Sequence, residues 1–89
     1  MGSYRIEWKQ SARKELRKLG KEGIPRILQA VEALTENPHL AGSRKLSGSE
    51  HIYRIRVGEY RVIYSVQASV LMVEVIKVGH RKDIYRKLS

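Results

Sequence analysis

The fold of this chain is indicated most clearly by the stretch Tyr53-Arg-Ile-Arg-Val-Gly-Glu-Tyr-Arg-Val-Ile-Tyr64. Apolar and polar residues alternate on both sides of Gly58-Glu59, a pattern typical of a β-hairpin. Two-residue hairpin turns that begin with glycine are common because glycine readily adopts the positive φ that such turns need. We therefore expect strands at residues 52–57 and 60–66, joined by this turn.

The register of this hairpin sorts its side chains onto two faces. Val57 should lie opposite Tyr60, and the next pair along should be Arg56 and Arg61. One face enters the core and carries Tyr53, Ile55, Val57, Tyr60, Val62 and Tyr64. The other face carries Arg54, Arg56 and Arg61.

The arginine face of the hairpin contains a local conflict. Two like charges directly opposite across strands destabilise a sheet, and Glu74 on the next strand is expected to offset only part of the repulsion. A bound anion would relieve it, since guanidinium pairs with phosphate through two hydrogen bonds and stays charged. The alternative is three solvated arginines on an uncovered sheet face.

The remaining elements predict an α+β fold. We expect a strand at residues 4–8, a helix from a Ser11 cap to Leu19 that Gly20 ends, and a second helix after Gly23 that Asn37-Pro38 ends. These helices form a helical hairpin on one face of a small antiparallel sheet. The second helix should carry an apolar stripe of Ile24, Ile27, Leu28, Val31 and Leu34. A loop at 39–51, with a short strand at 44–46, should lead into the hairpin. A third strand at 70–78 should add Leu71, Val73 and Val75 to the core and break at Gly79, and a short basic, partly helical tail should follow at 80–88.

Several other residues could carry chemistry. His80 and Arg81 follow the last strand, and histidine is the usual proton carrier at neutral pH. Tyr85 in the tail could stack on a base or present its hydroxyl. The first helix has a basic outer face with Arg13, Lys14 and Arg17, which could grip phosphates or be merely solvated.

Composition narrows the class of protein. The 89 residues predict a single domain, 1–89, and 18 Lys plus Arg against 9 Asp plus Glu leave a formal charge of +9, which favours a polyanionic partner. There is no cysteine, no apolar run that would span a membrane and no signal-peptide pattern, so we expect a cytoplasmic protein without a membrane partner. The sequence contains no metal-binding or glycine-rich phosphate motif, so no metal or small-molecule cofactor is expected.

Together, the hairpin Tyr53–Tyr64, Val78-Gly-His-Arg81, Tyr85 and the helical hairpin with Leu16-Arg-Lys-Leu19 resemble the RelE/ParE superfamily of toxins from type II toxin–antitoxin modules. The resemblance covers nearly the whole chain. It implies an mRNA interferase of the RelE branch that cleaves mRNA in the ribosomal A site and is neutralised by a cognate antitoxin.

The resemblance also implies residue roles. Arg61 and Arg81 match phosphate-contacting arginines, Tyr85 matches a tail tyrosine used in cleavage, and His80 is a further candidate for proton transfer. Arg54 and Arg56 match strand positions that are often lysine, and arginine cannot act as a base as lysine can. The implied reaction is attack of the RNA 2′-hydroxyl on the adjacent phosphate.

Two other functions remain open at this point. ParE-type relatives share the fold but bind DNA gyrase without cutting RNA. A basic module that binds RNA or the ribosome without catalysis is the second alternative.

Overall fold

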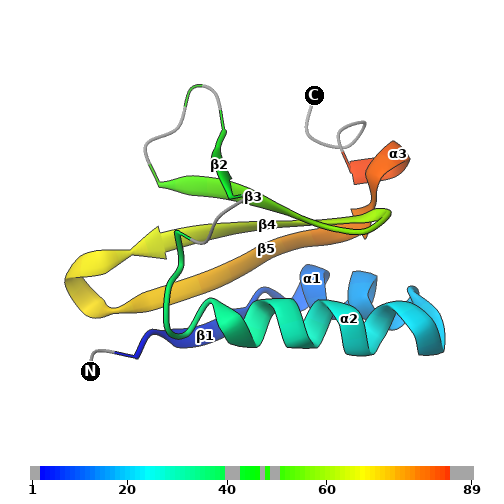
Figure 1. Cartoon of the computed structure of the whole chain (residues 1–89), viewed down its shortest axis with the longest axis horizontal. Helices are drawn as coiled ribbons and strands as arrows, with labels where there is room; N and C mark the ends of the chain where they lie inside the picture. Colours follow the sequence, from blue (N-terminus) through cyan, green and yellow to red (C-terminus); the bar gives the residue numbers. More distant parts are fainter. Residues whose placement is uncertain (1–2, 40–42, 47, 49–50, 85–89) are drawn as a thin grey trace.

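A computed structural model describes residues 3–39, 43–46, 48 and 51–84 of the chain. The elements are β1 (Arg5–Trp8), α1 (Gln10–Arg17), α2 (Gly20–Ala33), β2 (Arg44–Lys45), β3 (Ile52–Val57), β4 (Tyr60–Gln67), a 3-10 turn η1 (Ala68–Val70), β5 (Met72–His80) and α3 (Arg81–Ile84). The strands form one sheet in the order β1-β5-β4-β3-β2. Helices α1 and α2 lie on one side of this sheet and α3 lies on the other (Figure 1).

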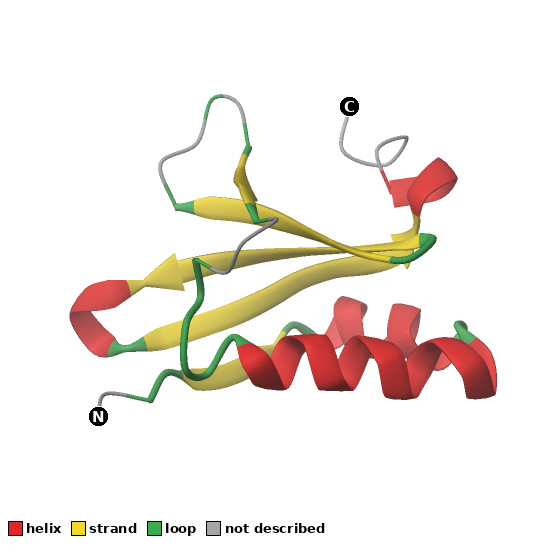
Figure 2. Ribbon diagram, viewed as in Figure 1, coloured by secondary structure: helices red, strands yellow, loops and turns green. Residues whose placement is uncertain are grey.

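The predicted α+β fold is confirmed, with one correction to the sheet. The pairs β2–β3, β3–β4 and β4–β5 are antiparallel, as expected, whereas β1 runs parallel to β5. After β1 the chain crosses one face of the sheet as α1 and α2 and reaches the far edge at β2 (Figure 2).

The β3–β4 hairpin has the predicted register, with Val57 opposite Tyr60 and Arg56 opposite Arg61. Its core face is also as predicted, since Ile55, Val62 and Tyr64 are buried and Tyr53, Val57 and Tyr60 pack against them. The core beneath α1 and α2 adds Ala12, Ile27, Val31, Leu34, Val66, Val73, Val75 and Val78.

The predicted third strand begins too early and ends too early. A 3-10 turn and Leu71, which adopts φ 50°, separate β4 from β5, so Leu71 is 41% exposed and contributes nothing to the predicted core. Gly79 does not break the strand, because it pairs with Arg61. A bulge in the β4–β5 pairing between Ile63 and Tyr64 turns both Val75 and Val78 toward the core, although they are an odd number of residues apart.

The helices also differ from prediction at their starts. Lys9, and not Ser11, is the residue that precedes α1, and its side chain cannot cap the helix because an ammonium group has no hydrogen-bond acceptor. The Lys9 amide donates to the carbonyl of Val75 in β5. Helix α2 begins at Gly20 and not after Gly23 as predicted. Only Lys18 and Leu19 separate the two helices, and the chain changes direction at Gly20, which has φ +77°. Leu28 was predicted to belong to the apolar stripe, but it is 44% exposed. It follows the inward-facing Ile27 by one residue, so its side chain points in another direction around the helix.

Tyr64 ties the sheet to the segment that follows α2. Its ring is fully buried, and its hydroxyl donates a 2.6 Å hydrogen bond to the carbonyl of Pro38. Burial raises the pKa of Tyr64 to about 12, with a smaller opposing effect from a hydrogen bond to Ser43. The phenol therefore stays protonated at neutral pH.

Replacing Tyr64 with Phe should lower the free energy of unfolding by about 1–3 kcal/mol, because the buried Pro38 carbonyl loses its donor. Chemical denaturation at neutral pH measures this loss.

The same pair of proteins gives a test by pH. Since the folded state holds the Tyr64 proton more tightly than the unfolded state, the contribution of Tyr64 is fully present below pH 10 and is lost as the pH rises toward about 12. Stability of the wild type should therefore fall more steeply above pH 10 than that of Tyr64→Phe. Parallel pH profiles would show that this phenol does not couple to folding.

Candidate anion site

The turn of the β3–β4 hairpin brings the candidate residues together. Gly58 has φ +60°, as a turn that begins with glycine requires. A side chain at Gly58 would also meet the guanidinium of Arg26 from α2, whose nearest nitrogen would lie 3.0 Å from the added carbon. The Arg26 guanidinium of α2 therefore lies against the glycine of the hairpin turn.

Arg61 is more enclosed than an exposed arginine face would imply. It is only 9% exposed, and its Nη1 donates to the carbonyls of Gly58 (2.9 Å) and Tyr60 (2.8 Å). Its neighbours Ile63 and Ser65 on the same face of β4 are buried as well. The expectation of an uncovered sheet face is therefore wrong at this end, where α3 lies over the sheet and Ile84 packs beside Gly79.

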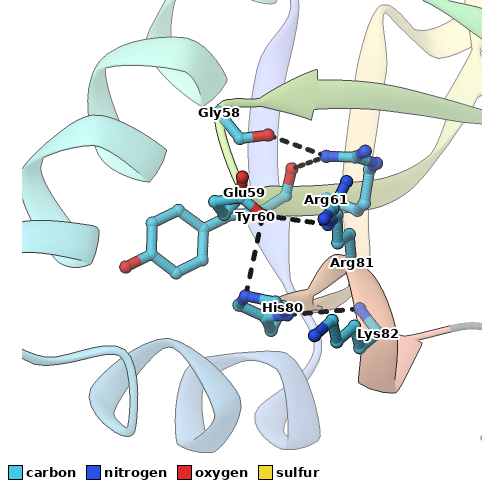
Figure 3. Close-up of polar contacts among 7 residues, drawn as sticks. All are labelled: Gly58, Glu59, Tyr60, Arg61, His80, Arg81 and Lys82. Atoms are coloured by element: carbon cyan, nitrogen blue, oxygen red, sulfur yellow. Dashed lines mark hydrogen bonds and ion pairs between the residues drawn. The ribbon is translucent and has the colours of Figure 1, made fainter.

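Glu59 holds the other end of the site together. Its carboxylate accepts from Nε of Arg81 at 2.9 Å, and its backbone carbonyl accepts from the Arg81 amide at 2.8 Å. The side chains are 61% and 51% exposed, so water screens this ion pair. The dashed lines in Figure 3 join the Glu59 carboxylate to both Arg81 and His80.

His80 is fixed by two neighbours. Its Nδ1 accepts a hydrogen bond from the Lys82 amide at 3.2 Å, and its Nε2 lies 3.9 Å from Oε2 of Glu59. A neutral imidazole with Nδ1 as acceptor carries its proton on Nε2. In this arrangement the Nδ1 lone pair of His80 is engaged by the Lys82 amide.

The predicted substrate-binding residues fall into two groups. Arg54 shares the face of Arg56 and Arg61, and it pairs with Arg44 of β2, so a second pair of arginines stands opposite each other beside the first. Arg13, Lys14 and Arg17 are exposed on α1, which lies on the opposite side of the sheet. The sheet therefore separates them from Arg54, Arg56 and Arg61.

The structure tests the expectation for Glu74 but not the one for Tyr85. Glu74 does not offset the charge of Arg61, because it lies opposite Ser65, four residues along β4 from Arg61. Its other neighbour across the sheet is Glu7. Tyr85 lies outside the described residues, so its role stays a prediction. Neither Arg56 nor Arg61 forms an ion pair with any carboxylate of the described residues.

Sequence reasoning missed Glu59, Arg26 and a cleft next to His80. The cleft has a volume of about 320 Å³ and lies between α1 and the two residues that follow it, the start of β4, the end of β5 and α3. The Glu15 carboxylate lies on the wall of the cleft and accepts hydrogen bonds from Lys77 Nζ (2.8 Å) and from the Val78 amide (3.1 Å). It thus supplies a partner to the edge of β5 beyond the point where β1 ends. Tyr60 pairs with His80, and the next residues beyond this pair are Glu59 and Arg81. The contact between Glu59 and Arg81 was not predicted because the predicted strand ended at residue 78.

The described residues include no group of three or more His, Asp or Glu side chains placed to hold a metal ion. Within the same residues, the helices are too short or too polar to cross a membrane.

Comparison with known proteins places this geometry in context. The family model described as "ParE toxin of type II toxin-antitoxin system, parDE" matches residues 6–85. Toxin RelG of Mycobacterium tuberculosis is 34% identical over 92 residues, which cover 94% of this chain and 98% of RelG.

Two further relatives come from Escherichia coli. The mRNA interferase toxin RelE of strain K12 is 30% identical over 90% of this chain and 85% of that toxin. The crystal structure of the intact RelBE toxin–antitoxin complex contains a chain that matches with a TM-score of 0.77 and 31% identity, over 88% of this chain and 96% of that one.

The opposed arginines Arg56 and Arg61 should respond differently to truncation. Arg61→Ala should cost about 1–3 kcal/mol of unfolding free energy, because it removes two hydrogen bonds from a charged, buried donor. Arg56 is exposed, so Arg56→Ala should change stability by no more than about 0.5 kcal/mol, or raise it slightly by removing repulsion. Denaturant titration of both variants tests this, and equal losses would contradict the role given to the Arg61 bonds.

Proposed function

The chain belongs to the RelE/ParE superfamily of toxins from type II toxin–antitoxin modules, and from this premise we propose that it is an endoribonuclease that cleaves messenger RNA on the ribosome. The observation that carries the proposal is the arginine cluster formed by Arg56, Arg61 and Arg81 at one end of the sheet. A relative named as an mRNA interferase supports the same activity.

The chemistry follows from what guanidinium groups can do. The 2′-oxygen of the RNA attacks the adjacent phosphorus, the bond from phosphorus to the 5′-oxygen breaks, and the products are a 2′,3′-cyclic phosphate and a 5′-hydroxyl end. The state between them carries extra negative charge on the phosphate oxygens, which preorganised cations stabilise. Arg61 and Arg81 would hold the scissile phosphate, and Arg54 and Arg56 would bind it or its neighbour.

One proton must leave the 2′-hydroxyl and one must reach the departing 5′-oxygen. Arginine cannot serve as the base, because it does not deprotonate at working pH. His80 has its one lone pair engaged by the Lys82 amide, which favours Tyr85 as the proton carrier. His80 becomes available if RNA displaces that contact.

The ribosome would supply what the cluster lacks. A flexible message must be bent so that the 2′-oxygen lies in line with the leaving oxygen, and a strand held in place meets this requirement at a lower entropic cost. Arg13, Lys14 and Arg17 lie on the other side of the sheet from the cluster, so we assign them to contacts with phosphates away from the cleavage point.

A cognate antitoxin is the second proposed partner. The solved RelBE complex pairs a similar chain with its antitoxin. With a formal charge of +9 on 89 residues, this chain should bind an acidic or amphipathic segment laid across its basic surface.

The alternative of a gyrase-directed toxin is favoured by one observation, the description of the matching family model as a ParE toxin. Expression in a bacterial host distinguishes the two. We expect protein synthesis to stop within minutes of induction, ahead of any DNA-damage response. DNA damage with continued protein synthesis would identify the gyrase-directed function instead.

Cleavage should depend on Arg81 and not on its neighbour Lys82. Arg81→Ala should abolish mRNA cleavage while leaving the fold intact, because its side chain is half exposed and its ion pair contributes at most about 1 kcal/mol. Lys82→Ala removes an equal charge one residue away and should retain cleavage. Mapping of mRNA 5′ ends after brief expression measures both, and undiminished cleavage by Arg81→Ala would contradict the assignment.

A further inference from the structure

We propose that Glu59 occupies the RNA phosphate position in the free protein and competes with RNA for Arg81. The inference rests on the proposed function, in that it assumes Arg81 receives a phosphate. It adds an internal anion that must leave before the phosphate can bind.

The contacts of Glu59 support this assignment. A single carboxylate oxygen, Oε2, lies 2.9 Å from Arg81 Nε and 3.9 Å from His80 Nε2. Carboxylate and phosphate oxygens bind guanidinium with the same geometry, so Glu59 satisfies the donor that a phosphate would use. Within the described residues, Glu59 is the one carboxylate that forms an ion pair with any arginine of the cluster.

The hairpin turn explains why Glu59 can be displaced without loss of the fold. Two sets of contacts do not involve the Glu59 side chain and remain when it moves away. The Glu59 carbonyl accepts from the Arg81 amide, and Arg61 donates to the carbonyls of Gly58 and Tyr60, the residues on either side of Glu59. The carboxylate itself is mostly exposed and can be hydrated by water. Displacement therefore costs only a screened surface ion pair.

The opposite role would be that Glu59 positions Arg81 for catalysis. The two roles predict opposite signs. If Glu59 competes, its neutralisation strengthens RNA binding and lowers KM with kcat unchanged. If Glu59 positions Arg81, its neutralisation lowers kcat.

The test measures binding separately from cleavage. A fluorescein-labelled RNA oligonucleotide with 2′-O-methyl groups cannot be cleaved by 2′-hydroxyl attack, and anisotropy reports its Kd for each purified protein. Glu59→Gln and Glu59→Ala are compared with Glu36→Gln, which changes the net charge equally at an exposed position after α2. Thermal unfolding verifies that each variant is folded.

We expect both Glu59 variants to bind about two- to fivefold more tightly than Glu36→Gln at low salt, which matches the value of one exposed ion pair. The gain should shrink as salt is raised. Adding Arg81→Ala to Glu59→Gln should abolish the gain, because the two residues then no longer share a partner.

Each other outcome has a defined meaning. Equal or weaker binding by the Glu59 variants, or a gain that survives Arg81→Ala, overturns the inference. Failure of every protein to bind the RNA overturns it as well. Tighter binding by the Glu59 variants without cleavage of unmodified mRNA on ribosomes by any protein would leave the competition intact and overturn the proposed nuclease.

Discussion

Two arginines, Arg56 and Arg61, lie opposite each other across the β3–β4 hairpin, and the rest of the site depends on that opposition. The two-residue turn leaves no freedom in the register, so Arg56 and Arg61 must lie opposite each other. The same alternation buries Ile55, Val62 and Tyr64 on the other face, so the pair cannot separate without exposing the core. The fold thus holds two cations in an arrangement that their own repulsion disfavours.

The structure relieves this repulsion only in part. Arg61 folds back onto the carbonyls of the turn and is buried, whereas Arg56 is exposed. Glu59 lies in the same turn, yet its carboxylate pairs with Arg81 and not with either arginine of the hairpin. A cluster that is only partly neutralised by the described carboxylates suits an external anion, and the sheet supplies the rigid support that such a site needs.

The sequence predicts the parts of this fold that are local. Alternation and the Gly58-Glu59 turn correctly predicted the hairpin register and its core face, and helical spacing identified α1 and α2. Predictions failed where distant segments decide the outcome. The end of β5 depends on pairing between Gly79 and Arg61, and the position of β1 depends on pairing with β5, which lies more than 60 residues further along the chain. The contacts of Glu59 and the burial of Arg61 depend on α3 and the end of β5, which no local pattern announces.

We expect RNA phosphate to bind on the arginine side of the sheet. This expectation is tested most directly by following the Nε–H signals of the arginines in the ¹⁵N NMR spectrum during titration with the uncleavable RNA. The signals of Arg56, Arg61 and Arg81 should shift together and saturate at one RNA concentration, with smaller shifts for Arg13 and Arg17 on the opposite side. Shifts confined to Arg13 and Arg17, with the hairpin arginines unchanged, would contradict it.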